Sequence, residues 1–230
     1  MALVTQEYAN SERLVDAFSQ QIAEILTQAI TDKGSASIAV SGGSTPKPLF
    51  QALSKIDLPW SQVNITLADE RWVDALDDAS NEKLVRENLL VNHARAARFM
   101  SMTTDDANAE DAVDEISARL EALGLPLDIL ILGMGEDGHT ASLFPCSAQI
   151  EEGINLARTQ PVLATQPTTA PHQRMSLSLA EIVKSKHVFL HITGDKKRQV
   201  LTQAISEHTP LEKPIKAVCD NTTLNLVWAP

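Results

Sequence analysis

A glycine-rich segment that holds an acid and a histidine two positions apart carries the clearest chemical signal in the sequence. It runs Gly133-Met-Gly-Glu-Asp-Gly-His139 and directly follows an aliphatic run that predicts a buried strand. Glycines on both sides allow a sharp turn at the end of that strand. A histidine beside a carboxylate can act as a general base near neutral pH. We therefore predict that His139 and Asp137 are catalytic residues.

The same segment contains the GxGxxG spacing of a dinucleotide site, but three features argue against that site. Glu136 and Asp137 would repel a pyrophosphate, and Pro145 would soon interrupt a long following helix. No second apolar strand leads to a ribose-binding acid about 20 residues further on.

A second segment, Ser41-Gly-Gly-Ser-Thr-Pro46, leaves another predicted strand and enters a predicted helix. Gly42 and Gly43 let the backbone approach a ligand closely, and Ser44 and Thr45 offer hydroxyl groups. The N–H groups at a helix N-terminus add partial positive charge, so the segment suits a phosphate. It lacks the Gly-Lys-Ser/Thr ending of a Walker A loop. A capped turn without a ligand explains the same residues, and both interpretations stay open.

Charged residues also lie at the ends of other predicted strands. They are Asp69-Glu-Arg71, Arg174 and the turn Gly194-Asp-Lys-Lys197. The planar fork of an arginine binds phosphate or carboxylate through two hydrogen bonds. On this interpretation Arg71, Arg174 and Lys197 bind an anion, and Asp69 orients a hydroxyl or a base. Taken singly, each of these charges is equally typical of a solvated loop.

Strands and helices alternate along the chain and would bring these segments together. Strands are expected at residues 37–41, 63–68, 97–100, 127–133, 175–179, 187–192 and 224–228. Helices are expected at 11–31, from Pro46 onward, and at 81–90, 109–123 and 196–206. This order predicts an α/β fold: one domain over residues 1–230, with a three-layer, open, mostly parallel sheet and helices on both faces. Run 175–179 is expected at a sheet edge. Ligands bind beyond the carboxyl ends of such strands.

The composition narrows the class of protein. Hydrophobic residues make up 43% and charged residues 21%, as in ordinary globular proteins. No transmembrane run or signal peptide is recognised, and Cys146 and Cys219 form no CxxC pair, so we expect a cytoplasmic protein. The net charge of −11 argues against nucleic-acid or membrane partners. It still permits a small anionic ligand where a few cations cluster.

Together and in this order, the segments resemble the 6-phosphogluconolactonase family. The matching stretches are Ala39-Val-Ser-Gly-Gly-Ser-Thr-Pro46, Leu67-Ala-Asp-Glu-Arg-Trp-Val73, Ser80-Asn-Glu, Gly133 to Pro145 and Ile192-Thr-Gly-Asp-Lys-Lys197. The resemblance implies a modified Rossmann fold similar to those of glucosamine-6-phosphate deaminase, ribose-5-phosphate isomerase and CoA transferases. It also implies hydrolysis of 6-phospho-D-glucono-1,5-lactone to 6-phospho-D-gluconate in the oxidative pentose phosphate pathway, without a metal or organic cofactor. We expect a monomer or weak dimer whose partner is this small-molecule substrate.

The resemblance also implies a role for each site residue. His139 would take a proton from the water that attacks the lactone carbonyl. Asp69 and Asp137 would orient His139, the water or the sugar hydroxyls, and these roles stay open between them. The phosphate would be held by Gly42, Gly43, Ser44, Thr45, Arg71, Arg174 and Lys197.

Two other functions compete with this interpretation. A sugar-phosphate deaminase or isomerase would carry similar loops, but the deaminase pattern has a glutamate where this chain has Phe144, which favours hydrolysis. A noncatalytic sugar-phosphate sensor would need a DNA-binding module. The N-terminal segment is too short for one, and the net charge has the wrong sign. The remaining histidines, His191 among them, are expected on the surface or packed within strands.

Overall fold

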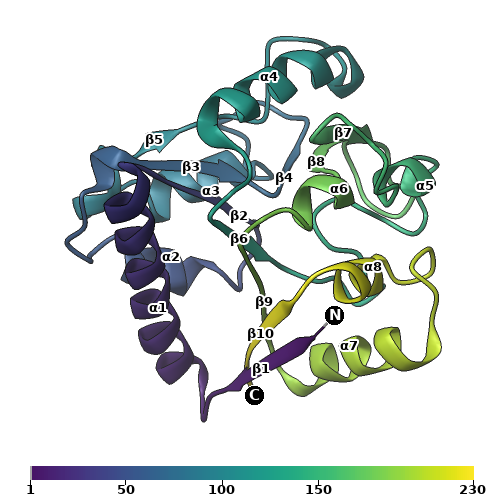
Figure 1. Cartoon of the computed structure of the whole chain (residues 1–230). Coiled ribbons are helices and arrows are strands. Elements are labelled where there is room, and N and C mark those ends of the chain that lie inside the picture. The colour runs from purple at the N-terminus through teal and green to yellow at the C-terminus, as the bar shows by residue number, and fades with distance from the viewer. Residues whose placement is uncertain (1) are drawn as a thin grey trace.

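A seven-stranded sheet, parallel throughout, forms the centre of the molecule (Figure 1). The computed structural model describes residues 2–230. The strands of the sheet are β1 (Leu3–Glu7), β2 (Ala36–Val40), β3 (Val63–Leu67), β5 (Arg98–Phe99), β6 (Ile129–Leu132), β9 (His187–Thr193) and β10 (Leu224–Ala229). Every residue of β2 and β6 is buried, which explains why β6 is entirely aliphatic and β2 is apolar except for Ser37.

Helices cover both faces of this sheet. The helices of residues 2–230 are α1 (Ser11–Lys33), α2 (Lys47–Leu53), α3 (Asn81–Asn88), α4 (Val113–Gly124), α5 (Ile150–Gly153), α6 (Leu179–Ile182), α7 (Asp195–Glu207) and α8 (Pro214–Asn221), with 3-10 helices at Trp60–Gln62, Asn92–Ala96 and Ala109–Ala112. Figure 1 shows α1 and α2 on one side and α6, α7 and α8 on the other. The predicted three-layer α/β fold is confirmed. None of the helices in residues 2–230 has the length and apolar character needed to cross a bilayer.

The strand order creates a crevice between β2 and β6. The sheet runs β1-β10-β9-β6-β2-β3-β5, so the chain moves one way from β2 and the other way from β6. The loops that follow these two neighbouring strands therefore separate, and open α/β sheets bind ligands at such a point. The two loops are residues 41–46 and 133–139, which are the two glycine-rich segments of the sequence.

A small antiparallel sheet stands beyond the carboxyl end of β3. It contains β4 (Asp69–Arg71), β8 (Arg174–Leu177) and β7 (Val162–Thr165), in the order β4-β8-β7. The prediction of an edge strand at 175–179 is wrong, because β8 is the middle strand of this sheet and is fully buried. Its neighbours are only three and four residues long, too short to give a recognisable strand pattern.

The sequence patterns also miss β1 and α8 and misplace the start of α2, which begins at Lys47 after Pro46. Strand β1 lacks a buried apolar pattern because it lies at the edge of the sheet, where Leu3 and Val4 are exposed. Helix α1 begins where expected, and the Asn10 side chain accepts a hydrogen bond from the Arg13 N–H at 2.9 Å.

A buried carboxylate joins the beginning of β6 to the beginning of β2. Asp128 is 1% exposed, and its Oδ2 accepts the backbone N–H of Ser37 at 2.8 Å. The ammonium groups of Lys33 and Lys186 lie 2.8 and 3.0 Å from its two oxygens. Burial by itself raises the pKa of Asp128, but the hydrogen bonds from the two lysines and from Ser37 outweigh it. The pKa of Asp128 therefore lies below its usual value.

We expect Asp128→Ala to lower the free energy of unfolding at neutral pH by about 1–3 kcal/mol, because the Ser37 N–H would be buried without its acceptor. Chemical denaturation measures the change, and Asp16→Ala on the exposed side of α1 is the control. A lowered folded-state pKa adds stability above the unfolded pKa, and that stability is lost as the pH falls through the folded pKa. The difference between variant and wild type should therefore narrow in acid. A difference that stays constant down to strongly acidic pH would contradict this account.

Candidate active site

The loops at the crevice border a cavity of about 400 Å³ that gathers the predicted site residues. Its lining includes Gly42, Gly43, Ser44, Thr45, Asp69, Arg71, His139, Arg174 and Lys197. Asp137 stands behind this wall, in contact with His139. Segments spread over more than 150 positions of the chain thus meet at one place, as expected for loops at the carboxyl ends of parallel strands.

Asp137 orients the imidazole of His139. Asp137 Oδ1 lies 2.6 Å from His139 Nδ1 and also accepts the backbone N–H of His139 at 3.1 Å. Burial raises the pKa of Asp137, but the hydrogen bond and charge of His139 outweigh it, so this pKa lies below its usual value. A carboxylate at Nδ1 favours the tautomer with its proton on Nδ1 and leaves Nε2 as the proton acceptor. Of the two aspartates that the sequence could not tell apart, Asp137 is the one that contacts the imidazole.

Gly135 allows the aspartate and the imidazole to come this close. A Cβ atom at this position would lie 2.2 Å from His139 Cε1 and 2.6 Å from Asp137 Oδ1. The turn closes through hydrogen bonds from the Gly138 N–H to the Gly135 carbonyl at 3.0 Å and from the Gly135 N–H to the His139 carbonyl at 2.9 Å. Gly138 has φ +82°, a conformation that favours glycine.

Two arginines face each other across the small sheet. Arg71 on β4 is the register partner of Arg174 on β8, and both line the cavity. Burial, and then the positive charge of Arg71, lowers the pKa of Arg174. The Nε of each arginine is buried and has no hydrogen-bond partner within residues 2–230. Like charges directly opposite each other in a sheet are destabilising. Two adjacent guanidinium groups with unused donors are suited to a doubly charged anion.

Lys197 brings a third cation to the cavity. It lies in the first turn of α7, and its Nζ donates to the Met134 carbonyl at 2.6 Å. The neighbouring Lys196 pairs with Glu136 at 2.6 Å. The start of α7 is therefore attached to the same turn that carries His139. Within residues 2–230, no group of three or more His, Cys, Asp or Glu side chains is arranged to hold a metal ion.

Asp69 lines the cavity but is held by a different partner. Its Oδ2 accepts the Ser142 hydroxyl at 2.6 Å, and its backbone carbonyl accepts Asn81 Nδ2 at 2.8 Å. Asn81 belongs to a matching stretch of the sequence but received no role there. It also lines the cavity, and a Cβ on Gly42 would lie 1.8 Å from its Oδ1. Gly42 is therefore needed for the close packing of this loop against α3.

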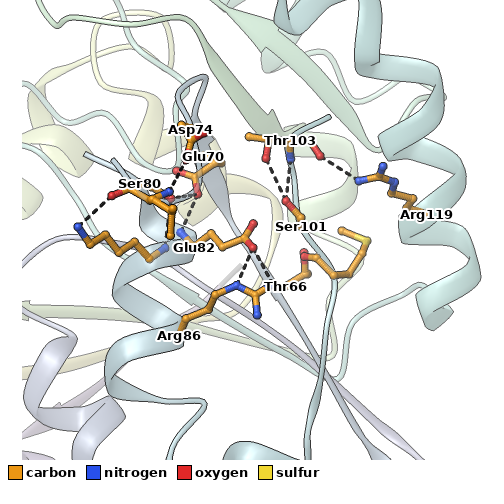
Figure 2. Close-up of polar contacts among 12 residues, drawn as sticks. Thr66, Glu70, Asp74, Ser80, Glu82, Arg86, Ser101, Thr103 and Arg119 are labelled. Atoms are coloured by element: carbon orange, nitrogen blue, oxygen red, sulfur yellow. Dashed lines mark hydrogen bonds and ion pairs between the residues drawn. The ribbon is translucent and has the colours of Figure 1, made fainter. Parts of the chain in front are cut away.

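Glu70, the middle residue of the charged triplet, joins β4 to the beginning of α3 and so fixes the side of the cavity formed by Arg71 and Asn81 (Figure 2). One carboxylate oxygen accepts the backbone N–H groups of Arg71 and Asn81 at 2.6 and 2.8 Å. The other accepts the Glu82 N–H at 2.7 Å and the Ser80 hydroxyl at 3.1 Å. Burial raises the pKa of Glu70 to about 6, although the N–H donors act in the opposite direction. Sequence reasoning gave Glu70 no role, because a charged triplet is also typical of a solvated loop.

Phe144 contacts both the imidazole of His139 and the guanidinium of Arg174. Its ring stacks on the His139 ring, with 4.0 Å between centroids and 26° between planes. The Cζ of Arg174 lies 5.7 Å from the centre of the Phe144 ring. Both distances are measured to the centre of the Phe144 ring. The centre of the His139 ring and the Cζ of Arg174 are therefore no farther apart than the sum of these two distances. A single hexose-sized molecule spans such a gap.

The similarity to known proteins extends over nearly the whole chain. Residues 9–228 match the family described as Glucosamine-6-phosphate isomerases/6-phosphogluconolactonase. A 6-phosphogluconolactonase of Neisseria meningitidis serogroup B is 41% identical over 226 residues, 96% of either chain. One of Rhizobium meliloti (strain 1021) is 39% identical over 225 residues, 97% of either chain. The crystal structure of a 6-phosphogluconolactonase from Shewanella baltica OS155 is 42% identical, with a TM-score of 0.96 over 99% of this chain and 98% of that one. The chain therefore belongs to the glucosamine-6-phosphate isomerase/6-phosphogluconolactonase family.

Proposed function

We propose that this protein hydrolyses the internal ester of 6-phospho-D-glucono-1,5-lactone to 6-phospho-D-gluconate, a step of the oxidative pentose phosphate pathway. The observation that carries the proposal is a single cavity in which an oriented imidazole and three cations lie within reach of one sugar phosphate. Relatives at 39–41% identity that carry the name 6-phosphogluconolactonase support the same substrate. We place the activity in the cytoplasm, on a monomer or weak dimer.

In the proposed mechanism His139 acts as the general base. Its Nε2 takes a proton from a water molecule while the water oxygen attacks the lactone carbonyl carbon. Asp137 holds the ring and stabilises the imidazolium that forms. When the tetrahedral intermediate collapses, the bond from this carbon to the ring oxygen breaks. The imidazolium then returns its proton to the departing oxygen, which becomes a hydroxyl of the product.

The opposite end of the substrate binds the cations. We assign the phosphate to Arg71, Arg174 and Lys197, together with the loop of residues 42–45. Some donors of the two arginines already bind the protein, because Arg71 donates to the Ala79 carbonyl and Arg174 to the Pro171 carbonyl. Because these bonds use Nη1 of Arg71 and Nη2 of Arg174, the other Nη group of each arginine remains for a ligand. Binding at the phosphate would position the distant carbonyl for attack.

The position of Phe144 favours hydrolysis over deamination. The deaminase pattern has a glutamate at this point, whereas here an apolar ring lies flat against the imidazole. The pairing of Asp137 with His139 in turn favours an enzyme over a sensor, because binding alone does not need an oriented base. Ammonia release from glucosamine 6-phosphate, or DNA binding without hydrolysis, would reverse this choice.

We expect His139→Ala to lower kcat by roughly 10²–10⁴-fold and to leave KM nearly unchanged, because the base acts only in the chemical step. The assay uses freshly generated 6-phosphogluconolactone and subtracts spontaneous hydrolysis. Asp137→Asn should also lower kcat. The double variant His139→Ala/Asp137→Asn should have a kcat only slightly below that of His139→Ala alone, because the two residues act as a unit. Wild-type turnover by His139→Ala would remove the base assignment.

A substitution beneath the imidazole tests the role of its orientation. Gly135→Ala should lower kcat more than it changes KM, because the added Cβ would displace the imidazole and the Asp137 carboxylate. Gly133→Ala is the matched control, since a Cβ there lies 4.0 Å from its nearest neighbour, the Ser41 Cβ, which is an ordinary contact. Wild-type kinetics for Gly135→Ala would show that the placement of the ring is unimportant.

The cations should govern binding rather than chemistry. We expect Arg174→Ala and Lys197→Ala each to raise KM for the phosphorylated lactone by roughly 10–100-fold, the effect of losing a hydrogen bond to a charged group. Unphosphorylated glucono-1,5-lactone, assayed alongside, should be hydrolysed by these variants at the wild-type rate. If both variants keep a normal kcat/KM for the phosphorylated substrate, the phosphate assignment fails.

A further inference from the structure

A second histidine lies in the wall of the cavity, and the mechanism above does not use it. His191 is near the carboxyl end of β9 and is 4% exposed. It lines both the main cavity and an adjoining hollow of about 260 Å³ between α1 and the loop after β2. Ser44 and Thr45 line the same two spaces. His191 therefore stands where the two spaces meet, together with Ser44 and Thr45 of this loop.

Packing accounts for an aromatic ring at this position but not for its nitrogen atoms. The ring of Phe18 on α1 meets the imidazole edge-on, with 5.7 Å between centroids. Phe18 also packs against Phe189, two residues earlier on the same face of β9, with 5.0 Å between centroids and 60° between the ring planes. A phenylalanine would fill the place of His191 equally well. The prediction that His191 packs within a strand is thus correct, but it leaves the polar atoms unexplained.

The nitrogen atoms of this imidazole are not used by the fold. Nδ1 of His191 is buried and has no hydrogen-bond partner in the described residues 2–230. An unpaired buried polar group costs about 1–3 kcal/mol, so folding alone favours an apolar side chain here. Burial also lowers the pKa of His191 to about 4. The neutral imidazole offers one donor and one acceptor and adds no charge to a site that already holds three cations.

We infer that His191 is a substrate-binding residue that donates a hydrogen bond to the phosphate group of the sugar phosphate, beside the hydroxyls of Ser44 and Thr45. The inference rests on the proposed function and adds a residue to its binding site. Two features favour the phosphate end over the reacting end. Lys197, one of the proposed phosphate ligands, follows His191 on the same strand-to-helix connection. Ser44 and Thr45, also proposed phosphate ligands, line both spaces that His191 lines, whereas His139 lines only the main cavity.

The test replaces only the nitrogen atoms. His191→Phe keeps an aromatic ring against Phe18, so its melting temperature should equal or exceed that of the wild type. We expect KM for 6-phosphogluconolactone to rise roughly 10-fold or more, with kcat nearly unchanged. Hydrolysis of unphosphorylated glucono-1,5-lactone should not change. His191→Asn and His191→Gln place an amide N–H near Nδ1 and Nε2, and at least one of them should recover part of the lost affinity.

Direct binding separates this inference from the proposed function. Isothermal titration calorimetry with 6-phosphogluconate should show weaker binding to His191→Phe by the same factor as the rise in KM. His187→Phe, at the exposed start of the same strand, should behave as the wild type. A wild type that neither hydrolyses the lactone nor binds the product would refute the proposed function. If the wild type does both and His191→Phe matches it, or if the unphosphorylated lactone suffers equally, only the role of His191 is refuted.

Discussion

The hydrogen bonds accepted by the Glu70 carboxylate hold in place the side of the cavity formed by Arg71 and Asn81. The four donors come from β4 and from the beginning of α3. A buried carboxylate is tolerable only when its oxygens are hydrogen-bonded, and here every bond also fixes a segment of the cavity. Arg71 and Asn81 are placed directly, and Asn81 in turn packs against Gly42. One anion outside the cavity lining thus sets the distance between the loop after β2 and the small sheet.

The order of the strands positions the remaining residues of the site. Because the chain turns back between β2 and β6, the loop of residues 41–46 and the turn of residues 133–139 open on the same crevice. The small sheet then brings Arg174 from a distant part of the chain to face Arg71. The turn after the parallel strand β6 carries His139 and Asp137, whereas the small antiparallel sheet carries Arg71 and Arg174, two of the three cations assigned to the phosphate. Phe144 contacts both sets of groups, because its ring stacks on the His139 imidazole and its centre lies 5.7 Å from the Arg174 Cζ.

The sequence predicts much of this arrangement, for a clear physical reason. Aliphatic runs such as 127–133 identify central parallel strands, and parallel strands end at one edge, so the residues that follow them must meet. The facing of Arg71 and Arg174 could not be predicted, because β4 has three residues and no apolar alternation. The separate partners of Asp69 and Asp137 depend on side-chain directions that only the folded turns determine. The sequence suggested no binding role for His191, because a histidine in an apolar strand usually reflects packing alone.

The opposed arginines of the small sheet have a consequence for the stability of the whole molecule. Their mutual repulsion weakens the folded chain, and a dianion between them removes that repulsion, so occupancy of the site and resistance to unfolding rise together. Dissolved salt would imitate part of this effect by screening the two charges. In a cell, a protein built this way is protected from unfolding and proteolysis in step with the supply of its own ligand.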